Sequence, residues 1–389
     1  MDITIHPRLL QGDIQIIPSK SQAHRLLICA AFANNETTLV CPETNRDIEA
    51  TVDCLNALGA NIQRTDSGYV IDPISVTPET AILNCCDSGS TLRFMLPIVG
   101  ALGVDATFQM AGRLPQRPLS PLWEEMERMG CHLSRPTADT IRCQGKLKAG
   151  EYVIDGGVSS QFITGLLFAT ALMEGKSKIT ITGNLESKPY VDMTEQALKL
   201  FDVPNFHSPG YLEVEGDWSN GAFFLAAQWL GSELSIHGLN TDSFQGDRTV
   251  VEILKQMDSG TPTVSAKDIP DLVPILSVVA AAKHGTVFTD IRRLRLKESD
   301  RVASTIAMIE SLGGKAEADE NTLRIYGTGL TGGTVDAVND HRIAMAAAIA
   351  ATACQQNVTI LGVECVKKSY PRFWEEYARL GGSYEQYLR

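Results

Sequence analysis

Cations and hydroxyl groups gather at the start of several long apolar runs in this sequence. The segment "PSKSQAHR" carries Lys20, Ser21 and Arg25 just ahead of "LLICAAFA". The segments "DSGSTLR" and "NDHR" place Arg93 and Arg342 at the start of later apolar runs. A helix N-terminus carries partial positive charge and favours acidic residues, so capping does not explain these cations. Hydroxyl and Asp side chains are ordinary N-caps, and each segment taken alone therefore also fits a plain helix start.

The recurrence of these cations indicates an anion-binding site. Free N–H groups at a helix start, together with a nearby Lys or Arg, bind phosphate or carboxylate groups. Gly89 adds a position at which a ligand can approach the backbone closely. If the helix starts converge, several anions could be bound together.

Four loops add further charged and hydroxyl groups. A run of charges usually lies on a solvated face, and this interpretation stays open for each loop taken alone. In "KESDR", Ser299 or Asp300 could simply cap the helix that follows. The residues of interest are Arg113 and Arg117 in "RLPQRP", Ser187, Lys188 and Tyr190 in "ESKPY", Arg293, Arg295, Lys297, Glu298 and Arg301 in "RRLRLKESDR", and Lys367 and Lys368 in "CVKKSYP".

Composition narrows the classes of partner. The 389 residues are 44% hydrophobic and 21% charged, with a formal net charge of -12, which argues against general binding to nucleic acid or anionic membranes. The segment "GTGLTG" matches a dinucleotide motif, but no helix pattern follows it. The seven histidines and nine cysteines show no metal-ligand spacing, so we expect no metal site. The start lacks the pattern of a signal peptide and no apolar stretch could span a bilayer, so we expect a cytoplasmic protein with reduced thiols.

A repeating order of elements must position these groups. Six runs that are apolar nearly all round predict buried helices, at 22–33, 90–102, 159–172, 220–230, 271–283 and 341–353. Each is followed by a β-rich run, a polar loop and an amphipathic helix. Six copies indicate internal duplication with three units in each half, and hence a two-domain α/β protein. We expect a boundary near 214–222, and we expect the first strand, "DITIHP", to cross over to the second half.

Eight motifs taken together resemble a known family. In order they are "PSKSQAHR", "DSGSTLRFM", "RLPQRPL", "VSSQFITGLL", "ESKPY", "IPDLVPIL", "LRLKESDR" and "NDHRIAMA", and they are similar to the signatures of 5-enolpyruvylshikimate-3-phosphate synthase. The resemblance runs from Lys20 to about Trp374. It implies two similar domains, each of three βαβαββ-type repeats, in the inverted α/β barrel-like enolpyruvyl transferase fold. The expected domains are 15–215 and 1–14 plus 216–389, with the active site in the cleft between them.

The resemblance also implies the reaction. Such an enzyme transfers the enolpyruvyl group of phosphoenolpyruvate to the 5-hydroxyl of shikimate 3-phosphate and releases phosphate, through a tetrahedral intermediate. This is the sixth step of the shikimate pathway to aromatic amino acids. The resemblance implies two anionic small-molecule substrates, no cofactor or metal, no nucleic-acid or membrane partner, and a monomer.

Site residues follow motif by motif from the resemblance. Asp271 would be the base for the 5-hydroxyl, Glu298 the acid for the methylene carbon, and Lys20 could share either role. The residues expected to hold shikimate 3-phosphate are Lys20, Ser21, Arg25, Ser159, Ser160, Gln161, Ser187, Asp271 and Lys297. The residues expected to hold phosphoenolpyruvate are Lys20, Gly89, Arg117, Gln161, Arg301, Arg342 and Lys368.

Some positions depart from the family pattern. Arg293 stands where many members carry a smaller polar residue, and Asp87 where an Asn is frequent, so neither is included in the site. Members insensitive to glyphosate often carry Ala at the position of Gly89, and we therefore expect inhibition by glyphosate.

Three alternative functions fit the sequence less well. The sister transferase acting on UDP-N-acetylglucosamine usually carries a reactive Cys in the loop matching "AGRLPQRPLSPL", where this sequence has none. RNA 3'-terminal phosphate cyclase shares the repeat, but the acidic composition argues against it. A non-catalytic relative would have lost Asp271, Glu298 or Lys20, and all three are present.

Overall fold

Each predicted apolar run is a helix in the computed structural model, which describes residues 1–387. Most residues of these helices are buried, as expected for segments that are apolar nearly all round. The six helices are α1 (Lys20–Ala31), α3 (Gly89–Leu102), α5 (Ser160–Leu172), α7 (Trp218–Trp229), α9 (Val273–Ala282) and α11 (His341–Ala350).

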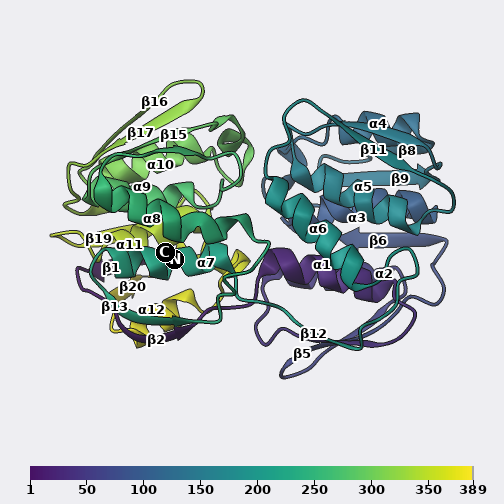
Figure 1. Ribbon diagram of the computed structural model, residues 1–389, viewed down its shortest axis with the longest axis horizontal. Coiled ribbons are helices and arrows are strands. Elements are labelled where there is room, and N and C mark those ends of the chain that lie inside the picture. Colours follow the sequence, from purple (N-terminus) through teal and green to yellow (C-terminus); the bar gives the residue numbers. More distant parts are fainter. Residues whose placement is uncertain (388–389) are drawn as a thin grey trace. The chain divides into compact units, whose positions relative to one another are not determined.

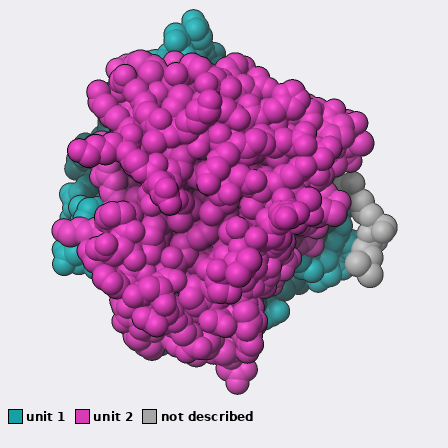
Figure 2. Space-filling view, turned by 90° about the vertical axis from the view of Figure 1, so that its right-hand side faces the viewer, with its two compact units in different colours: residues 1–17, 216–389 teal, residues 18–215 magenta. Residues whose placement is uncertain are grey.

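The chain divides into two compact units. Unit 1 comprises Met1–Ile17 and Gly216–Arg389, and unit 2 comprises Pro18–Glu215, coloured teal and magenta in Figure 2. Each unit has a hydrophobic core of its own. The domains proposed from the sequence differ from this division only in where 15–17 are assigned.

Unit 2 contains three sheets (Figure 1). The first has the order β12 (Tyr211–Glu213), β3 (Thr37–Val40), β5 (Gly68–Asp72) and β4 (Asn61–Arg64). The second has the order β6 (Thr80–Asn84), β7 (Asp105–Gln109), β9 (Thr140–Gly145) and β8 (Cys131–Ser134). The third is the parallel pair β10 (Glu151–Asp155) and β11 (Lys178–Thr182).

Unit 1 contains sheets of the same kinds. One has the order β14 (Thr263–Ser265), β15 (Thr286–Thr289), β17 (Thr322–Tyr326) and β16 (Lys315–Ala318). Another has the order β18 (Gly333–Asp336), β19 (Val358–Leu361), β1 (Asp2–His6) and β20 (Ser383–Tyr387), so the first strand pairs with two of the last. The third is the parallel pair β13 (Glu233–His237) and β2 (Gln11–Gln15).

The sheets reveal the repeat that the sequence indicated. In one copy, α3 connects the parallel strands β6 and β7, β9 pairs antiparallel with β7, and β8 pairs antiparallel with β9. The same order is found in β14, α9, β15, β16 and β17. A parallel pair requires such a crossover, which explains why α3, α5, α9 and α11 each lie between the two strands of a parallel pair. The remaining helices are α2 (Arg46–Ala57), α4 (Leu122–Arg128), α6 (Lys188–Leu200), α8 (Val250–Ser259), α10 (Arg301–Ser311) and α12 (Phe373–Arg379). The 3-10 turns are η1 (Leu114–Gln116), η2 (Gly246–Thr249), η3 (Arg292–Leu296) and η4 (Val363–Lys368).

Within residues 1–387, no helix combines the length and the apolar character that a membrane crossing needs.

The helices α3 and α5 pack closely because Gly165 has no side chain. A Cβ atom at Gly165 would lie 2.2 Å from the carbonyl oxygen of Arg93 and 3.0 Å from Cγ of Pro97. The first distance is to backbone, so a larger residue could fit only if the two helices moved apart. Since α3 and α5 both begin with predicted site residues, this contact helps to fix the site.

We predict that Gly165→Ala lowers the free energy of unfolding by about 1–3 kcal/mol, because overpacking displaces a helix. Thr170→Ala is the matched control: the Thr170 hydroxyl bonds only within α5, and its loss should change stability by about 0.5 kcal/mol or less. Urea unfolding of both variants measures the difference. Equal stability of Gly165→Ala and the control would contradict the prediction.

Candidate active site

Arg301 is a buried guanidinium bound by three carboxylates of unit 1. It is the first residue of α10 and its side chain is 1% exposed. Its Nη1 lies 2.5 Å from Asp271 Oδ1, its Nη2 2.8 Å from Glu298 Oε2, and its Nε 2.9 Å from Asp340 Oδ2. We call Asp271, Glu298, Arg301 and Asp340 the Arg301 cluster. It unites the two predicted catalytic carboxylates on one guanidinium.

Asp340 performs two tasks in this cluster. It is the N-cap of α11, with Oδ1 accepting from the backbone N–H of Arg342 at 3.0 Å. Its Oδ2 accepts from the Ser299 hydroxyl at 2.9 Å as well as from Arg301. Asp340 is fully buried. From the sequence Asp340 is an ordinary helix-start acid, and its contact with Arg301 could not be predicted.

The capping interpretation of "KESDR" is correct only in part. Asp300 caps α10 by accepting from the N–H groups of Val302 and Ala303, each at 3.1 Å. Glu298 nevertheless turns to Arg301. The segment therefore starts the helix and supplies a site carboxylate.

Arg342 presents a buried guanidinium with donors to spare. Its side chain is 3% exposed and its Nη2 lies 3.5 Å from Asp271 Oδ2. Its Nε and Nη1 have no hydrogen-bond partner among residues 1–387. Unsatisfied buried donors are costly, so these atoms indicate a place where an anionic ligand can bind.

Electrostatics keep Asp271 ionised. Burial alone would raise its pKa, but the charges of Arg342, Arg301 and Lys297 outweigh burial and hold that pKa well below its usual range. Burial lowers the pKa of Lys297 to about 8, although Asp271 opposes the shift. Lys297 follows η3, and Lys368, 8% exposed, ends η4.

In unit 2, the lysine at the start of α1 forms an ion pair with a carboxylate of α2. Lys20 Nζ lies 2.9 Å from Oδ2 of Asp47, which belongs to the first turn of α2. Ser19 caps α1, and Ser21 follows Lys20 in the first turn. Asp47 is 3% exposed and was not recognised from the sequence, because nothing in "NRDIEA" distinguishes it from an ordinary helix-start acid.

The starts of α3 and α5 meet through a chain of polar side chains. Gln161 Nε2 donates to Ser90 Oγ at 2.9 Å, and Gln161 Oε1 accepts from Arg93 Nη1 at 2.7 Å. A Cβ atom at Gly89 would lie 2.5 Å from Arg117 Nη1. The predicted residues Gly89, Arg117 and Gln161 are thus brought together. Ser159 and Ser160 start the same helix, α5.

Arg25 is placed differently from the other predicted residues. It is 2% exposed, and its guanidinium donates to Thr194 Oγ1 at 2.9 Å, Ser21 O at 2.6 Å and Tyr190 O at 2.8 Å. All three acceptors are neutral, and burial lowers the pKa of Arg25 to about 10. These bonds tie α1 to α6, whose N-cap is Ser187 in the left-handed region at φ 56°.

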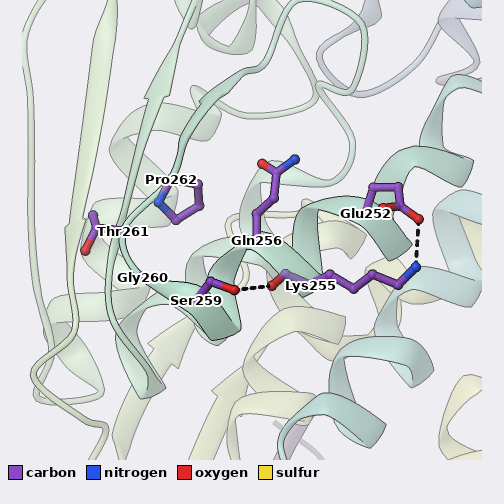
Figure 3. Close-up of a pocket in the computed structure, with 7 residues that line it drawn as sticks. All are labelled: Glu252, Lys255, Gln256, Ser259, Gly260, Thr261 and Pro262. Atoms are coloured by element: carbon purple, nitrogen blue, oxygen red, sulfur yellow. Dashed lines mark hydrogen bonds and ion pairs between the residues drawn. The ribbon is translucent and has the colours of Figure 1, made fainter.

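The hollow at the end of α8 contains none of the predicted site residues. A hollow of about 510 Å³ in unit 1 is lined by Glu252, Lys255, Gln256, Ser259, Gly260, Thr261 and Pro262 (Figure 3). None of these is a predicted site residue, and Lys255 Nζ pairs with Glu252 at 2.8 Å. Within residues 1–387, no group of three or more His, Cys, Asp or Glu side chains is arranged to hold a metal ion.

Comparison with known proteins shows the family of this chain. The family model described as EPSP synthase (3-phosphoshikimate 1-carboxyvinyltransferase) matches residues 5–377. A 3-phosphoshikimate 1-carboxyvinyltransferase of Clostridium kluyveri is 39% identical over 419 aligned positions, covering 99% of this chain and 98% of the relative. One of Clostridium acetobutylicum is also 39% identical, over 421 positions with the same coverage.

Solved structures share the fold. EPSP synthase from Acinetobacter baumannii superposes with a TM-score of 0.80 at 21% identity, covering 100% of both chains. The enolpyruvyl transferase NikO from Streptomyces tendae gives a TM-score of 0.76 at 16% identity, covering 99% of this chain and 98% of the other. The predicted fold, a two-domain α/β enolpyruvyl transferase fold, is thereby confirmed.

We predict that Asp340→Ala lowers the free energy of unfolding by about 3–5 kcal/mol, because it leaves Arg301 buried with incomplete charge compensation. Asp300→Ala is the matched control, since it removes a helix cap and an exposed ion pair with Arg295 and should cost about 1 kcal/mol. Urea midpoints at an unchanged m-value measure both. A loss for Asp340→Ala no larger than that for Asp300→Ala would refute this account of the cluster.

Proposed function

The chain belongs to the EPSP synthase (3-phosphoshikimate 1-carboxyvinyltransferase) family, and from this premise we propose which of its side chains carry out each step. The enzyme transfers the enolpyruvyl group of phosphoenolpyruvate to shikimate 3-phosphate in the shikimate pathway. The observation on which our assignment depends is that Arg301 binds both Asp271 and Glu298.

Asp271 takes the proton of the 5-hydroxyl group. A general base must be ionised at the working pH, and three cations keep Asp271 so. The hydroxyl oxygen then bonds to C2 of phosphoenolpyruvate, while Glu298 gives a proton to the methylene carbon. This yields the tetrahedral intermediate. Lys20 is the alternative group for either transfer.

Elimination completes the reaction. The new methyl group returns a proton to Glu298, the bond from C2 to the phosphate oxygen breaks, and the leaving phosphate takes up the proton that Asp271 accepted from the 5-hydroxyl group. Preorganised cations favour this step because negative charge develops on the leaving phosphate.

Two sets of residues bind the substrates. Arg342 contacts phosphoenolpyruvate directly, because its Nε and Nη1 lack partners among residues 1–387, whereas Arg301 already serves three carboxylates. Arg301 therefore contributes mainly charge and the placement of Asp271 and Glu298. The other residues assigned to phosphoenolpyruvate are Lys20, Gly89, Arg117, Gln161 and Lys368. Those assigned to shikimate 3-phosphate are Lys20, Ser21, Arg25, Ser159, Ser160, Gln161, Ser187, Asp271 and Lys297.

Arg25 acts on its substrate chiefly through its positive charge and its bond to Ser21. Its donors to Thr194, Ser21 and Tyr190 fix the start of α1, from which Lys20 and Ser21 project. Gly89 keeps Arg117 close to the start of α3, and a methyl group there would displace the guanidinium. We further propose a monomer located in the cytoplasm; its nine free cysteines fit a reducing compartment.

We predict that Asp271→Asn lowers phosphate release by about 10²–10⁴-fold, because an amide cannot accept the hydroxyl proton. Asp258→Asn is the control, since this carboxylate pairs with Lys283 at the surface and should leave the rate unchanged. The assay mixes phosphoenolpyruvate with shikimate 3-phosphate and omits each substrate in turn. If the wild type releases phosphate only when UDP-N-acetylglucosamine replaces shikimate 3-phosphate, the proposed acceptor is wrong.

We predict that kcat/KM for shikimate 3-phosphate falls as the pH rises through about 8, because Lys297 then loses the charge that attracts the phosphate. Lys297 is charged below this pKa and neutral above it, so the loss lies on the alkaline side. Lys297→Arg stays charged and should move the fall to higher pH. An unchanged alkaline limb in Lys297→Arg would show that another group is responsible.

A further inference from the structure

Asp247 is a buried carboxylate in unit 1 that the mechanism above does not use. It lies in η2 and is 2% exposed. The hydroxyl of Ser219, in the first turn of α7, donates a hydrogen bond to Asp247 Oδ2. Asp247 Oδ1 is equally buried and has no hydrogen-bond partner among residues 1–387. Only one oxygen of this carboxylate is therefore satisfied.

The surroundings of Asp247 include the proposed base. The charged groups that act on it are Asp271, Arg342 and Asp217. Asp217 caps α7, Asp271 lies just before α9, and Arg342 belongs to the first turn of α11. These three helices pack against one another, and η2 packs against α7.

Other charged groups of the neighbouring elements have partners of their own, and Asp258 of α8 pairs with Lys283. On α8, which also packs against η2, Glu252 and Lys255 pair with each other at the surface (Figure 3). On η2 itself, the exposed Arg248 donates from Nη1 to Thr241 O at 2.7 Å. The carboxylates of Asp271 and Asp217 thus raise the pKa of Asp247, and the guanidinium of Arg342 lowers it.

A purely structural role does not explain an acid at this position. An Asn side chain would accept the Ser219 hydrogen bond equally well, whereas a buried ionised carboxylate without a hydrogen-bonded cation is costly. Burial and the negative charge of Asp271 raise the pKa of Asp247 to about 7. Cations hold the pKa of Asp271 far lower. Two neighbouring carboxylates whose proton affinities are pushed apart are characteristic of acid–base sites.

We propose that Asp247 is a positioning residue that holds a proton beside Asp271 and, by losing it, increases the basicity of Asp271. While Asp247 is neutral, the cations around Asp271 outweigh the negative charge of Glu298, and Asp271 is a weak base. Once Asp247 is ionised, a further negative charge acts on Asp271, which then binds the proton of the 5-hydroxyl more strongly. No proton passes between the two carboxylates in this scheme. The proposal depends on the role of Asp271 as the base.

The test is the pH dependence of kcat/KM for phosphate release by the full chain, compared for wild type and Asp247→Asn. Both proteins share the ionisations of the substrates and of Lys297. The kcat/KM of wild type divided by that of Asp247→Asn at each pH therefore isolates the effect of Asp247. We expect this ratio to rise about three- to ten-fold between about pH 6 and pH 8, because a base whose pKa rises by about 1–2 reacts faster. A ratio independent of pH would overturn the proposal.

Ser219→Ala provides a second variant that keeps the carboxylate. The Ser219 hydrogen bond favours the ionised form of Asp247, so its loss should shift the rise in activity to higher pH. This outcome stays measurable if Asp247→Asn fails to fold. An identical profile for Ser219→Ala and wild type would count against the proposal.

Asp271→Asn separates this proposal from the proposed function. If Asp271→Asn is inactive while Asp247→Asn shows the wild-type pH profile, Asp271 remains the base and Asp247 has only a structural role. If Asp271→Asn retains full activity, the assignment of the base is wrong, and the proposal for Asp247 is wrong with it.

Discussion

The burial of the Arg301 guanidinium among three carboxylates constrains the whole of unit 1. A buried cation must be compensated by several hydrogen-bonded anions, and Arg301 obtains them from the segments that precede α9, α10 and α11. Those segments can meet only if the apolar helices pack as they do. The arrangement that compensates the charge of Arg301 thus also brings Asp271 and Glu298 to the same guanidinium.

Unit 2 solves a different electrostatic problem. Arg25 donates its hydrogen bonds to neutral oxygens. The neutral amide of Gln161 forms hydrogen bonds with both Ser90 and Arg93. These hydrogen bonds fix the starts of α1, α3 and α5. The neutral acceptors of Arg25 leave its positive charge available to an anionic substrate.

Much of this organisation could be predicted from local sequence. The six apolar runs are helices because nearly every face of each one is buried, and the cations at their starts could be noticed because they oppose the helix dipole. Partners distant in sequence could not be predicted. Asp340 and Asp47 look like ordinary helix-start acids, and only the fold brings them to Arg301 and Lys20. The neutral partners of Arg25 and the burial of Asp247 likewise depend on tertiary packing.

The ionisation of Asp271 in the folded protein tests the central claim most directly. Carbon-13 NMR of side-chain carboxyl groups, with Asp271 assigned by comparison with Asp271→Asn, would follow its titration. If Arg301, Arg342 and Lys297 keep this carboxylate ionised, its resonance should stay constant from about pH 8 down to about pH 4. A titration of Asp271 within that range would contradict the account, because the cations around it would then not outweigh its burial.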